Sequence, residues 1–450
     1  MHPLVVLLIT VALIFLLIIK LRINPFIALV TAATTVGVLS PLVKFGDVMP
    51  LVAGHFGRLC GNIGIVIALA ALIGQCLMES GAADKIVRVL VRLFGEKNAS
   101  LSMLTSGYIL SVPVFFDTVF YLLIPLARAL RVRTGKGYVL FIMCVAAGGT
   151  VTHSMVPPTP GPLGMAANLN VDLGVMILVG AIVAVPMSLA GWAFALYRNN
   201  HLDIPLRETP GMSLAELEEL AASQEDKLPS FFVSMLPIVL PVLMITSNTL
   251  VGALEIAGPI AELTAFLGNP NFALLVSAAI SVGILMKQKG LTLGDLTDTV
   301  ETALASGGLI ILITAGGGAF GGMLVEAEVG STIGDMASTM GMPVLILSFL
   351  LAAVLKVAQG SGTVAMITGS AIMAPIVLAG VPFHPVYVAC IIGAGSLFGS
   401  WMNDSGFWVY AKMSGLTEIE ALQTWTPLLA ILGATGAIVT LIMAALMPLV

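Results

Sequence analysis

The sequence predicts an all-α integral membrane fold built from two inverted repeats, and three observations support this prediction. Of the 450 residues, 58% are hydrophobic and 10% are charged, and the mean hydropathy of +1.07 is far above that of soluble chains. A short sequence signature recurs at a constant offset along the chain. Polar clusters also interrupt apolar stretches at equivalent positions of the two halves.

Several apolar runs approach or reach the roughly 20 residues that a helix needs to cross the hydrocarbon core of a membrane. They cover residues 3–19, 26–42, 63–78, 171–195, 231–245 and 428–450. The first run has no basic start and no small-residue cleavage site, so we interpret it as a membrane span rather than a secretory signal.

Segments of the first half return in the same order in the second half. Asn24-Pro25 recurs as Asn269-Pro270, an offset of 245 residues. The same offset links Thr118 with Thr363, Gly148 with Gly393, and Gly161 with Gly406. One offset that relates several segments indicates a duplication.

Each half is expected to contain five spanning helices, one of them broken, and one hairpin that enters and leaves on the same side. Because a re-entrant hairpin adds no net crossing, five crossings would invert the second half relative to the first. The expected units are 1–196 (first membrane repeat), 197–228 (cytoplasmic linker) and 229–450 (second, inverted membrane repeat). Within the linker, Ser213-Leu214-Ala215-Glu216 matches a capping box, which predicts a short surface helix.

The positions of the basic residues predict the orientation, because short cytoplasmic loops carry an excess of Lys and Arg. If the N-terminus lies outside, only Lys44 and Arg58 fall on the outer side, and Lys356 falls within a hairpin. All the other Lys and Arg residues then lie inside. The sequence therefore predicts a multi-pass membrane protein with both termini on the side opposite the cytoplasm.

The first hairpin is expected over residues 100–131, with its tip at 112–118. Pro113 lacks a backbone donor, so the interrupted helix frees carbonyl groups that need protein or water partners, which implies a lined cavity. An ionised Asp117 at that depth would cost about 2.5–3.5 kcal/mol, so we expect it to be protonated part of the time or paired. Asp117 is thus a candidate proton-coupling group or substrate contact, with Thr118 as a substrate contact. The alternative is a structural aspartate that caps the second arm.

The second hairpin is expected over residues 342–379, with its tip at 358–363. Glycine at 360 and 362 lets the backbone approach a bound group, and the hydroxyl groups of Ser361 and Thr363 lie at the start of the next helix. Exposed amides and the positive end of a helix dipole suit a carboxylate. Gly360, Ser361, Gly362 and Thr363 are therefore candidate substrate contacts. Lys356 either balances a bound anion, pairs with an acid, or extends to the membrane surface.

Two broken helices follow the hairpins, at residues 148–162 and 393–407. The first is rich in proline and holds His153 and Thr159; the second holds Asn403, Asp404 and Ser405. His153 is a candidate proton-coupling residue, although a lone histidine is as often a hydrogen-bonded structural group. Thr159, Asn403, Asp404 and Ser405 are candidate contacts for the hydroxyl groups of a substrate. Asp404 is a second candidate proton carrier, and a helix cap is its structural alternative.

Other chemistries find little support in the sequence. The four cysteines show no CxxC spacing and lie in or beside apolar helices, which favours buried thiols over a metal site or disulfides. The glycine run 316–322 lacks the lysine of a phosphate-binding loop, so we interpret it as a site of close helix packing. No nucleophile or metal set of a membrane-embedded enzyme is evident. We expect no cofactor, no metal and no nucleic-acid partner.

Several motifs together resemble the gluconate permease family of proton symporters. They are Val114-Phe115-Phe116-Asp117, His153 with Pro157-Pro158 and Pro160-Gly161-Pro162, Gln359-Gly360-Ser361, and Asn403-Asp404-Ser405-Gly406-Phe407-Trp408. The similarity covers nearly the whole chain, including the linker. The resemblance implies proton-coupled uptake of gluconate or a related aldonate such as idonate, or of fructuronate or D-serine, across the bacterial inner membrane.

The sequence thus favours a secondary active transporter of a small carboxylate, driven by protons. Sodium coupling is an alternative, because free backbone carbonyls at the breaks can also bind a cation. A passive anion channel is another alternative, because the same tips could line a continuous pore. A homodimer is possible.

Overall fold

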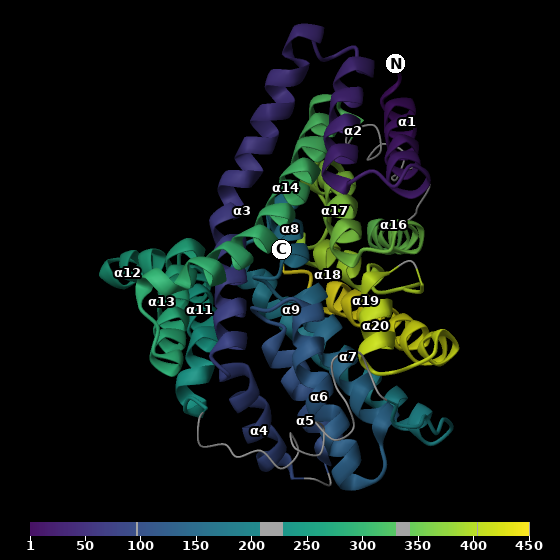
Figure 1. The fold of residues 1–450 in the computed structure, drawn as a ribbon. Coiled ribbons are helices and arrows are strands. Elements are labelled where there is room, and N and C mark those ends of the chain that lie inside the picture. The colour runs from purple at the N-terminus through teal and green to yellow at the C-terminus, as the bar shows by residue number, and fades with distance from the viewer. Residues whose placement is uncertain (96–97, 208–227, 330–342, 403, 450) are drawn as a thin grey trace.

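The computed structural model describes residues 1–95, 98–207, 228–329, 343–402 and 404–449, and in these ranges the regular structure is helical (Figure 1). The helices of the first half are α1 (Pro3–Phe15), the π-helical η1 (Leu16–Lys20), α2 (Pro25–Leu39), the 3₁₀-helical η2 (Phe45–Asp47), α3 (Val48–Glu79), α4 (Ala82–Phe94), α5 (Ala99–Leu110), α6 (Phe116–Thr134), α7 (Tyr138–Met155), α8 (Pro160–Asn168) and α9 (Leu173–Asn199). Those of the second half are α11 (Phe231–Ala253), α12 (Pro259–Leu267), α13 (Pro270–Lys289), the 3₁₀-helical η4 (Leu293–Leu296), α14 (Thr297–Glu326), α16 (Val344–Gln359), α17 (Gly362–Leu378), α18 (Val386–Gly395), α19 (Ser405–Met413) and α20 (Glu418–Leu446).

The predicted all-α membrane fold is confirmed. Within the described ranges, seven helical segments are long and apolar enough to cross a membrane. The predicted spans 3–19 and 26–42 correspond to the shorter apolar helices α1 and α2. The repeat boundaries and the number of crossings stay predictions, and the predicted helix at 213–216 lies outside the described residues.

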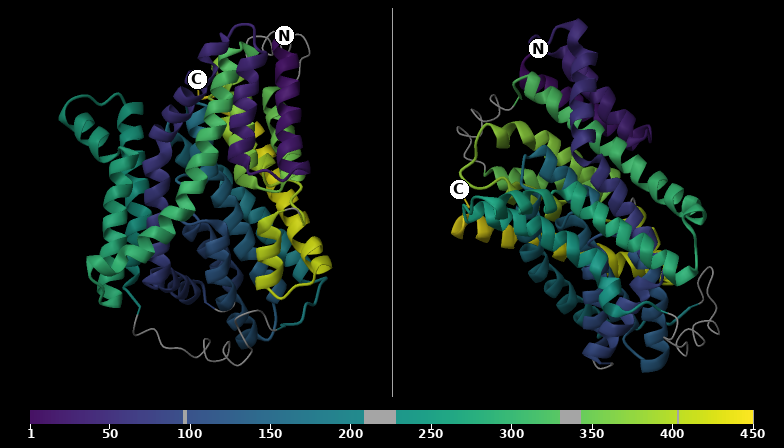
Figure 2. Two further views of the ribbon diagram at one scale, coloured as in Figure 1. Left: turned by 45° about the horizontal axis from the view of Figure 1, so that its top comes forward. Right: turned by 90° about the vertical axis from the view of Figure 1, so that its left-hand side faces the viewer.

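Two long helices, α3 and α14, run along one side of the molecule. They pack against each other extensively, α2 lies against α14, and α13 lies against α3 (Figure 1). The group α11, α12 and α13 occupies the outer side of α3 (Figure 2). The glycine run of α14 contributes to this packing, because a Cβ on Gly318 would lie 2.3 Å from the Leu59 side chain of α3. This agrees with the interpretation of the run as a packing surface.

The deepest part of the fold is formed by α7, α17 and α18. All ten residues of α18 are buried, as are residues 364–377 of α17 and nearly all of α7. A helix that is apolar on all sides belongs in the interior of a bundle. These three helices adjoin the predicted hairpin tips and breaks, so they hold those irregular segments inside the protein.

Glycine permits very close contact between α5 and α7. A Cβ built on Gly148 would lie 2.1 Å from the backbone oxygen of Leu104, which cannot move aside as a side chain can. Gly107 faces the Val145 oxygen in the same way, at 2.8 Å. Small residues that let helix backbones touch are a common means of packing in membranes.

Gly148→Ala is therefore expected to be severely destabilising. Overpacking of this kind costs at least about 1–3 kcal/mol, and here the obstructing atom belongs to the backbone. Thermal unfolding of the detergent-solubilised protein measures the effect. The matched control is Gly283→Ala, since no atom lies within 4 Å of a Cβ at that helical position. Equal melting temperatures for the two variants would contradict the proposed contact.

The first break is shorter than predicted. We expected it to begin at Gly148, but α7 continues to Met155, and only residues 156–159 are non-helical before α8 starts at Pro160. The run Gly148–Thr152 stays helical because it is enclosed by α5, and Thr150 donates its hydroxyl group to the Ala146 oxygen at 2.7 Å. The second break is also shorter than predicted, because residues 393–395 belong to α18 and residues 405–407 belong to α19.

Candidate functional site

The two helix pairs predicted as hairpins have their tips where the sequence placed them. Helices α5 and α6 are joined by residues 111–115, and α16 and α17 by Gly360 and Ser361. Gly360 has φ +89°, a conformation that favours glycine. Ser361 caps α17, because its hydroxyl oxygen accepts a hydrogen bond from the Val364 amide at 3.3 Å.

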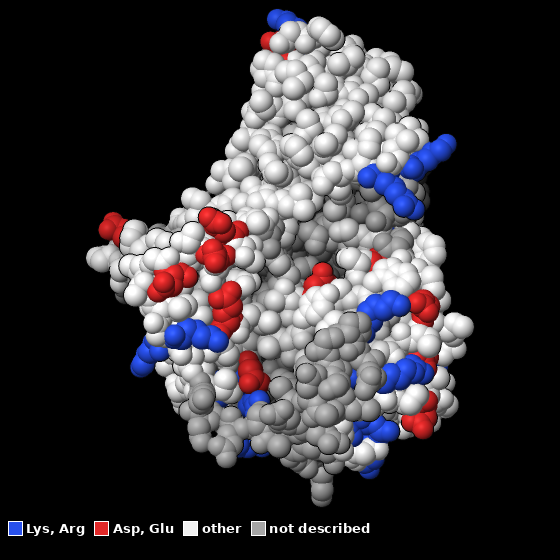
Figure 3. All heavy atoms as spheres, viewed as in Figure 1, with Lys and Arg blue, Asp and Glu red and all other residues white. Residues whose placement is uncertain are grey.

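Both tips, the second break and the helical residues that flank the first break border one cavity of about 450 Å³. Figure 3 shows a hollow near the middle of one face of the molecule, with acidic side chains visible in it. The volume falls in the range of small-molecule sites. The lining residues are Phe115, Phe116, Asp117, Thr118, Thr150, His153, Ser154, Pro160, Leu309, Ile310, Ile313, Lys356, Ser361, Gly362, Thr363, Val364, Ser396, Leu397, Asp404, Ser405, Gly406, Trp425 and Leu429.

Four helices begin at this cavity. The first residues of α6, α8, α17 and α19 are all among its lining residues. The N-terminal end of a helix carries a partial positive charge, although α8 offers few amide donors because it begins with Pro160-Gly161-Pro162. The cavity is therefore suited to an anion.

Most of the predicted site residues meet here, although some do not. The residues that line the cavity are Asp117, Thr118, His153, Lys356, Ser361, Gly362, Thr363, Asp404 and Ser405. Thr159 is not among them. Its hydroxyl group donates to the backbone oxygens of Val156 and His153 and thus caps the C-terminal end of α7. Gly360 contributes to the site through its backbone oxygen, and Asn403 lies outside the described residues.

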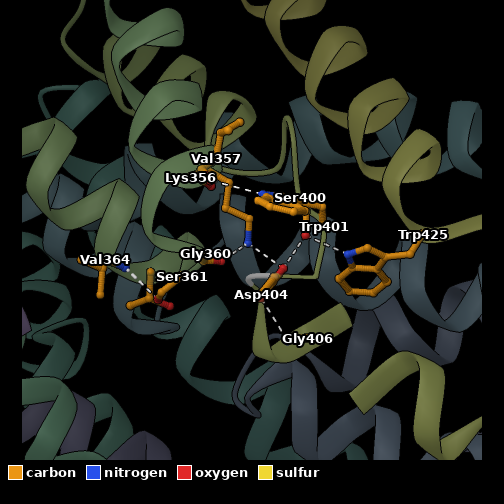
Figure 4. Close-up of polar contacts among 12 residues, drawn as sticks. Lys356, Val357, Gly360, Ser361, Val364, Ser400, Trp401, Asp404, Gly406 and Trp425 are labelled. Atoms are coloured by element: carbon orange, nitrogen blue, oxygen red, sulfur yellow. Dashed lines mark hydrogen bonds and ion pairs between the residues drawn. The ribbon is translucent and has the colours of Figure 1, made fainter. Parts of the chain in front are cut away.

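Lys356 and Asp404 form a buried ion pair. The Lys356 Nζ atom lies 2.6 Å from Asp404 Oδ2, and the residues are only 3% and 6% exposed. The same ammonium group donates to the Gly360 oxygen at 2.6 Å. Of the three predicted alternatives for Lys356, the structure therefore shows pairing with an acid. Figure 4 shows that this pair joins the second hairpin to the start of α19.

Asp404 has several donors around its carboxylate. Ser400 donates its hydroxyl group to Oδ2, and the Gly406 amide donates to Oδ1 at 2.9 Å (Figure 4). The contact to Gly406 is the helix cap named as the structural alternative. Asp404 therefore both caps α19 and forms the counter-charge of Lys356.

Asp117 is in a different environment. It lies in the first turn of α6, half-buried at the cavity wall, and it forms no hydrogen bond or ion pair with the part of the chain that the structure describes. Asp404 and Lys356 act on it electrostatically across the cavity. Its carboxyl group is thus available to a proton or a ligand.

His153 faces the second hairpin across the cavity. Its Nε2 atom lies 3.5 Å from the Thr363 hydroxyl oxygen, and its ring packs edge-on against Phe115. The Nδ1 atom is buried without a partner among the described residues. His153 therefore connects the end of α7 with the tips of both hairpins.

Three residues of the site lie within the predicted breaks at 148–162 and 393–407, although we did not name them as site residues from the sequence. Thr150, Ser154 and Ser396 add hydroxyl groups to the cavity wall. Trp425 lies near the start of the long apolar helix α20, where nothing in the sequence distinguishes it from a core residue.

Comparisons with known proteins were made on sequence and on structure. The sequence model described as "GntP family permease" matches residues 2–447. A low-affinity gluconate transporter of Escherichia coli K12 is 33% identical over 443 residues, which cover 96% of each chain. A gluconate permease of Pseudomonas aeruginosa is 32% identical over 447 residues, which cover 97% of this chain and 96% of the relative. An uncharacterized permease of Haemophilus influenzae is 34% identical over 433 residues, which cover 93% of this chain and 87% of the relative.

A solved structure shares the fold. The crystal structure of the Alcanivorax borkumensis YdaH transporter, whose topology is described as unusual, matches with a TM-score of 0.62. The match covers 94% of this chain and 98% of that chain at 13% sequence identity. At this identity the likeness concerns the fold alone.

Proposed function

Because this chain belongs to the GntP permease family and is a transporter rather than an enzyme, we propose that it imports gluconate or a related aldonate by proton symport. Relatives named as gluconate transporters support the substrate class. The observation that carries the proposal is the single cavity at which four helix N-termini, a buried lysine and an unpaired carboxyl group meet.

The substrate carboxylate is proposed to bind at the tip of the second hairpin. There it would accept hydrogen bonds from the first amides of α17 and from the hydroxyl groups of Ser361 and Thr363, near the Lys356 ammonium group. The hydroxyl groups of the sugar acid would face Thr118 and Ser405, which lie on the opposite helix starts. Asn403 is proposed as a further hydroxyl contact.

Asp117 is proposed as the proton carrier. A carboxyl group that forms no ion pair can gain and lose a proton without breaking one, and half-burial disfavours its charge when no cation is bound beside it. Asp404 is already held by Lys356, so its role is that of a counter-charge. His153 is proposed to assist proton movement, since its ring lies between the two hairpin tips.

Uptake into proteoliposomes that contain the purified protein tests the function. We expect an inward proton gradient to drive accumulation of labelled gluconate, a protonophore to abolish it, and unlabelled aldonates to compete. A sodium gradient alone should have no effect. Accumulation that requires sodium would show that sodium, and not the proton, is the coupling ion. Uptake that only equilibrates would indicate a channel. Competition by D-serine but not by aldonates would reassign the substrate.

A further inference from the structure

A series of buried hydrogen bonds connects Trp425, a residue that lines the cavity, with Asp404 through Ser400. The Trp425 Nε1 group donates to the Ser400 hydroxyl oxygen at 2.8 Å, and Ser400 donates in turn to Asp404 Oδ2 (Figure 4). Ser400 is 0% exposed and is not among the lining residues of the cavity. It therefore cannot contact a substrate in this conformation and acts only through its neighbours.

Trp425 is held in a fixed orientation at the first position of this series of hydrogen bonds. Its side chain is 1% exposed, and its ring lies 5.5 Å from the ring of Phe116 and 5.2 Å from that of Tyr410, measured between centroids. Contacts of this kind fix an aromatic ring in one orientation. The indole N–H is consequently aimed at Ser400.

The other end of the series reaches the substrate-binding tip. Lys356 holds Asp404 Oδ2 and the Gly360 oxygen at the same time, each at 2.6 Å. The Asp404 oxygen that accepts from Lys356 is also the one that accepts from Ser400. The orientation of this carboxylate thus determines where the lysine sits, and the lysine in turn holds the second hairpin tip.

We propose that Ser400 and Trp425 are positioning residues that act through Asp404 and Lys356 to hold the tip of the second hairpin in its substrate-binding conformation. This inference rests on the proposed binding of a substrate carboxylate at that tip. Ser400 does not line the cavity, and Trp425 acts on the tip through its hydrogen bond to Ser400. Their effect is preorganisation, which acts on affinity rather than on the step that moves substrate.

The test is transport kinetics of Ser400→Ala and Trp425→Phe in proteoliposomes. Ser400→Ala removes both hydrogen bonds of the Ser400 hydroxyl group, whereas Trp425→Phe removes only the one to Ser400 and retains most of the ring packing. We expect KM for gluconate to rise about tenfold, equivalent to about 1.4 kcal/mol, with Vmax within about twofold of the wild type. Ser400→Thr keeps the hydroxyl group and should restore a KM near that of the wild type.

Trp192→Phe is the matched control, because Trp192 Nε1 also donates to a serine hydroxyl group, that of Ser100 at 3.2 Å, away from the cavity. Its KM should not change. An unchanged KM in Trp425→Phe, a fall in Vmax alone, or an equal rise of KM in Trp192→Phe would overturn the inference. If Ser400→Ala does not fold, the KM values of Trp425→Phe and Ser400→Thr test the inference. A wild type that does not take up gluconate would refute the proposed function instead, so the two failures are distinct.

Discussion

Asp117→Asn is expected to abolish accumulation of gluconate against a gradient while leaving exchange of substrate across the membrane. Asparagine has nearly the shape of aspartate, but it cannot carry a proton. Internal gluconate should then rise only to the external concentration, whatever proton gradient is imposed. The measurement is the ratio of internal to external labelled gluconate in proteoliposomes, together with a counterflow assay in the absence of a gradient.

Asp84→Asn is the control for this variant. Asp84 pairs with Arg88 on α4 and does not line the cavity, so the change removes a carboxylate outside the site. Its accumulation ratio should equal that of the wild type. If Asp117→Asn still concentrated gluconate, Asp117 would not be the proton carrier, and Asp404 or His153 would have to take that role.

Lys356→Ala is expected to have the second large effect, on both stability and binding. It leaves Asp404 buried without its counter-charge, and removing one partner of a buried ion pair costs about 3–5 kcal/mol. It also removes the cation that we place near the substrate carboxylate. Thermal unfolding in detergent and a gluconate-binding assay on the same preparation measure the two effects.

The double variant Lys356→Met with Asp404→Asn separates these effects. Because it removes both charges, we expect much of the stability to return while gluconate binding stays lost. Lys412→Ala is the control, since its pair with Glu418 is largely exposed and should contribute little to stability. A Lys356→Ala variant that is as stable as the wild type would mean that the pair does not hold Asp404.

Local sequence signals predicted much of the framework. The Asn-Pro signature starts a helix in both halves, because Asn24 and Asn269 each accept a hydrogen bond from the backbone amide two residues on, at 2.9 and 3.0 Å. Glycine and serine at the second tip predicted the turn before α17. These signals are local because capping and backbone conformation involve residues within a few positions of each other.

Contacts between distant segments could not be predicted in the same way. Lys356 and Asp404 are 48 residues apart, and Trp425 reaches Ser400 over 25 residues. The packing of the helices determines which acidic residue forms an ion pair with a buried lysine. The same limit explains the error at α7, where enclosure by α5 keeps a run of glycine and threonine helical. The termini in the periplasm and the homodimer stay predictions.

Simultaneous measurement of proton and gluconate fluxes tests the central claim most directly. Proteoliposomes are loaded with a pH-sensitive dye, the membrane potential is clamped, and gluconate is added outside with no initial pH difference. We predict that the interior acidifies as labelled gluconate enters, and that the acidification disappears in Asp117→Asn. Entry of gluconate into wild-type vesicles with no movement of protons would contradict proton symport through this cavity.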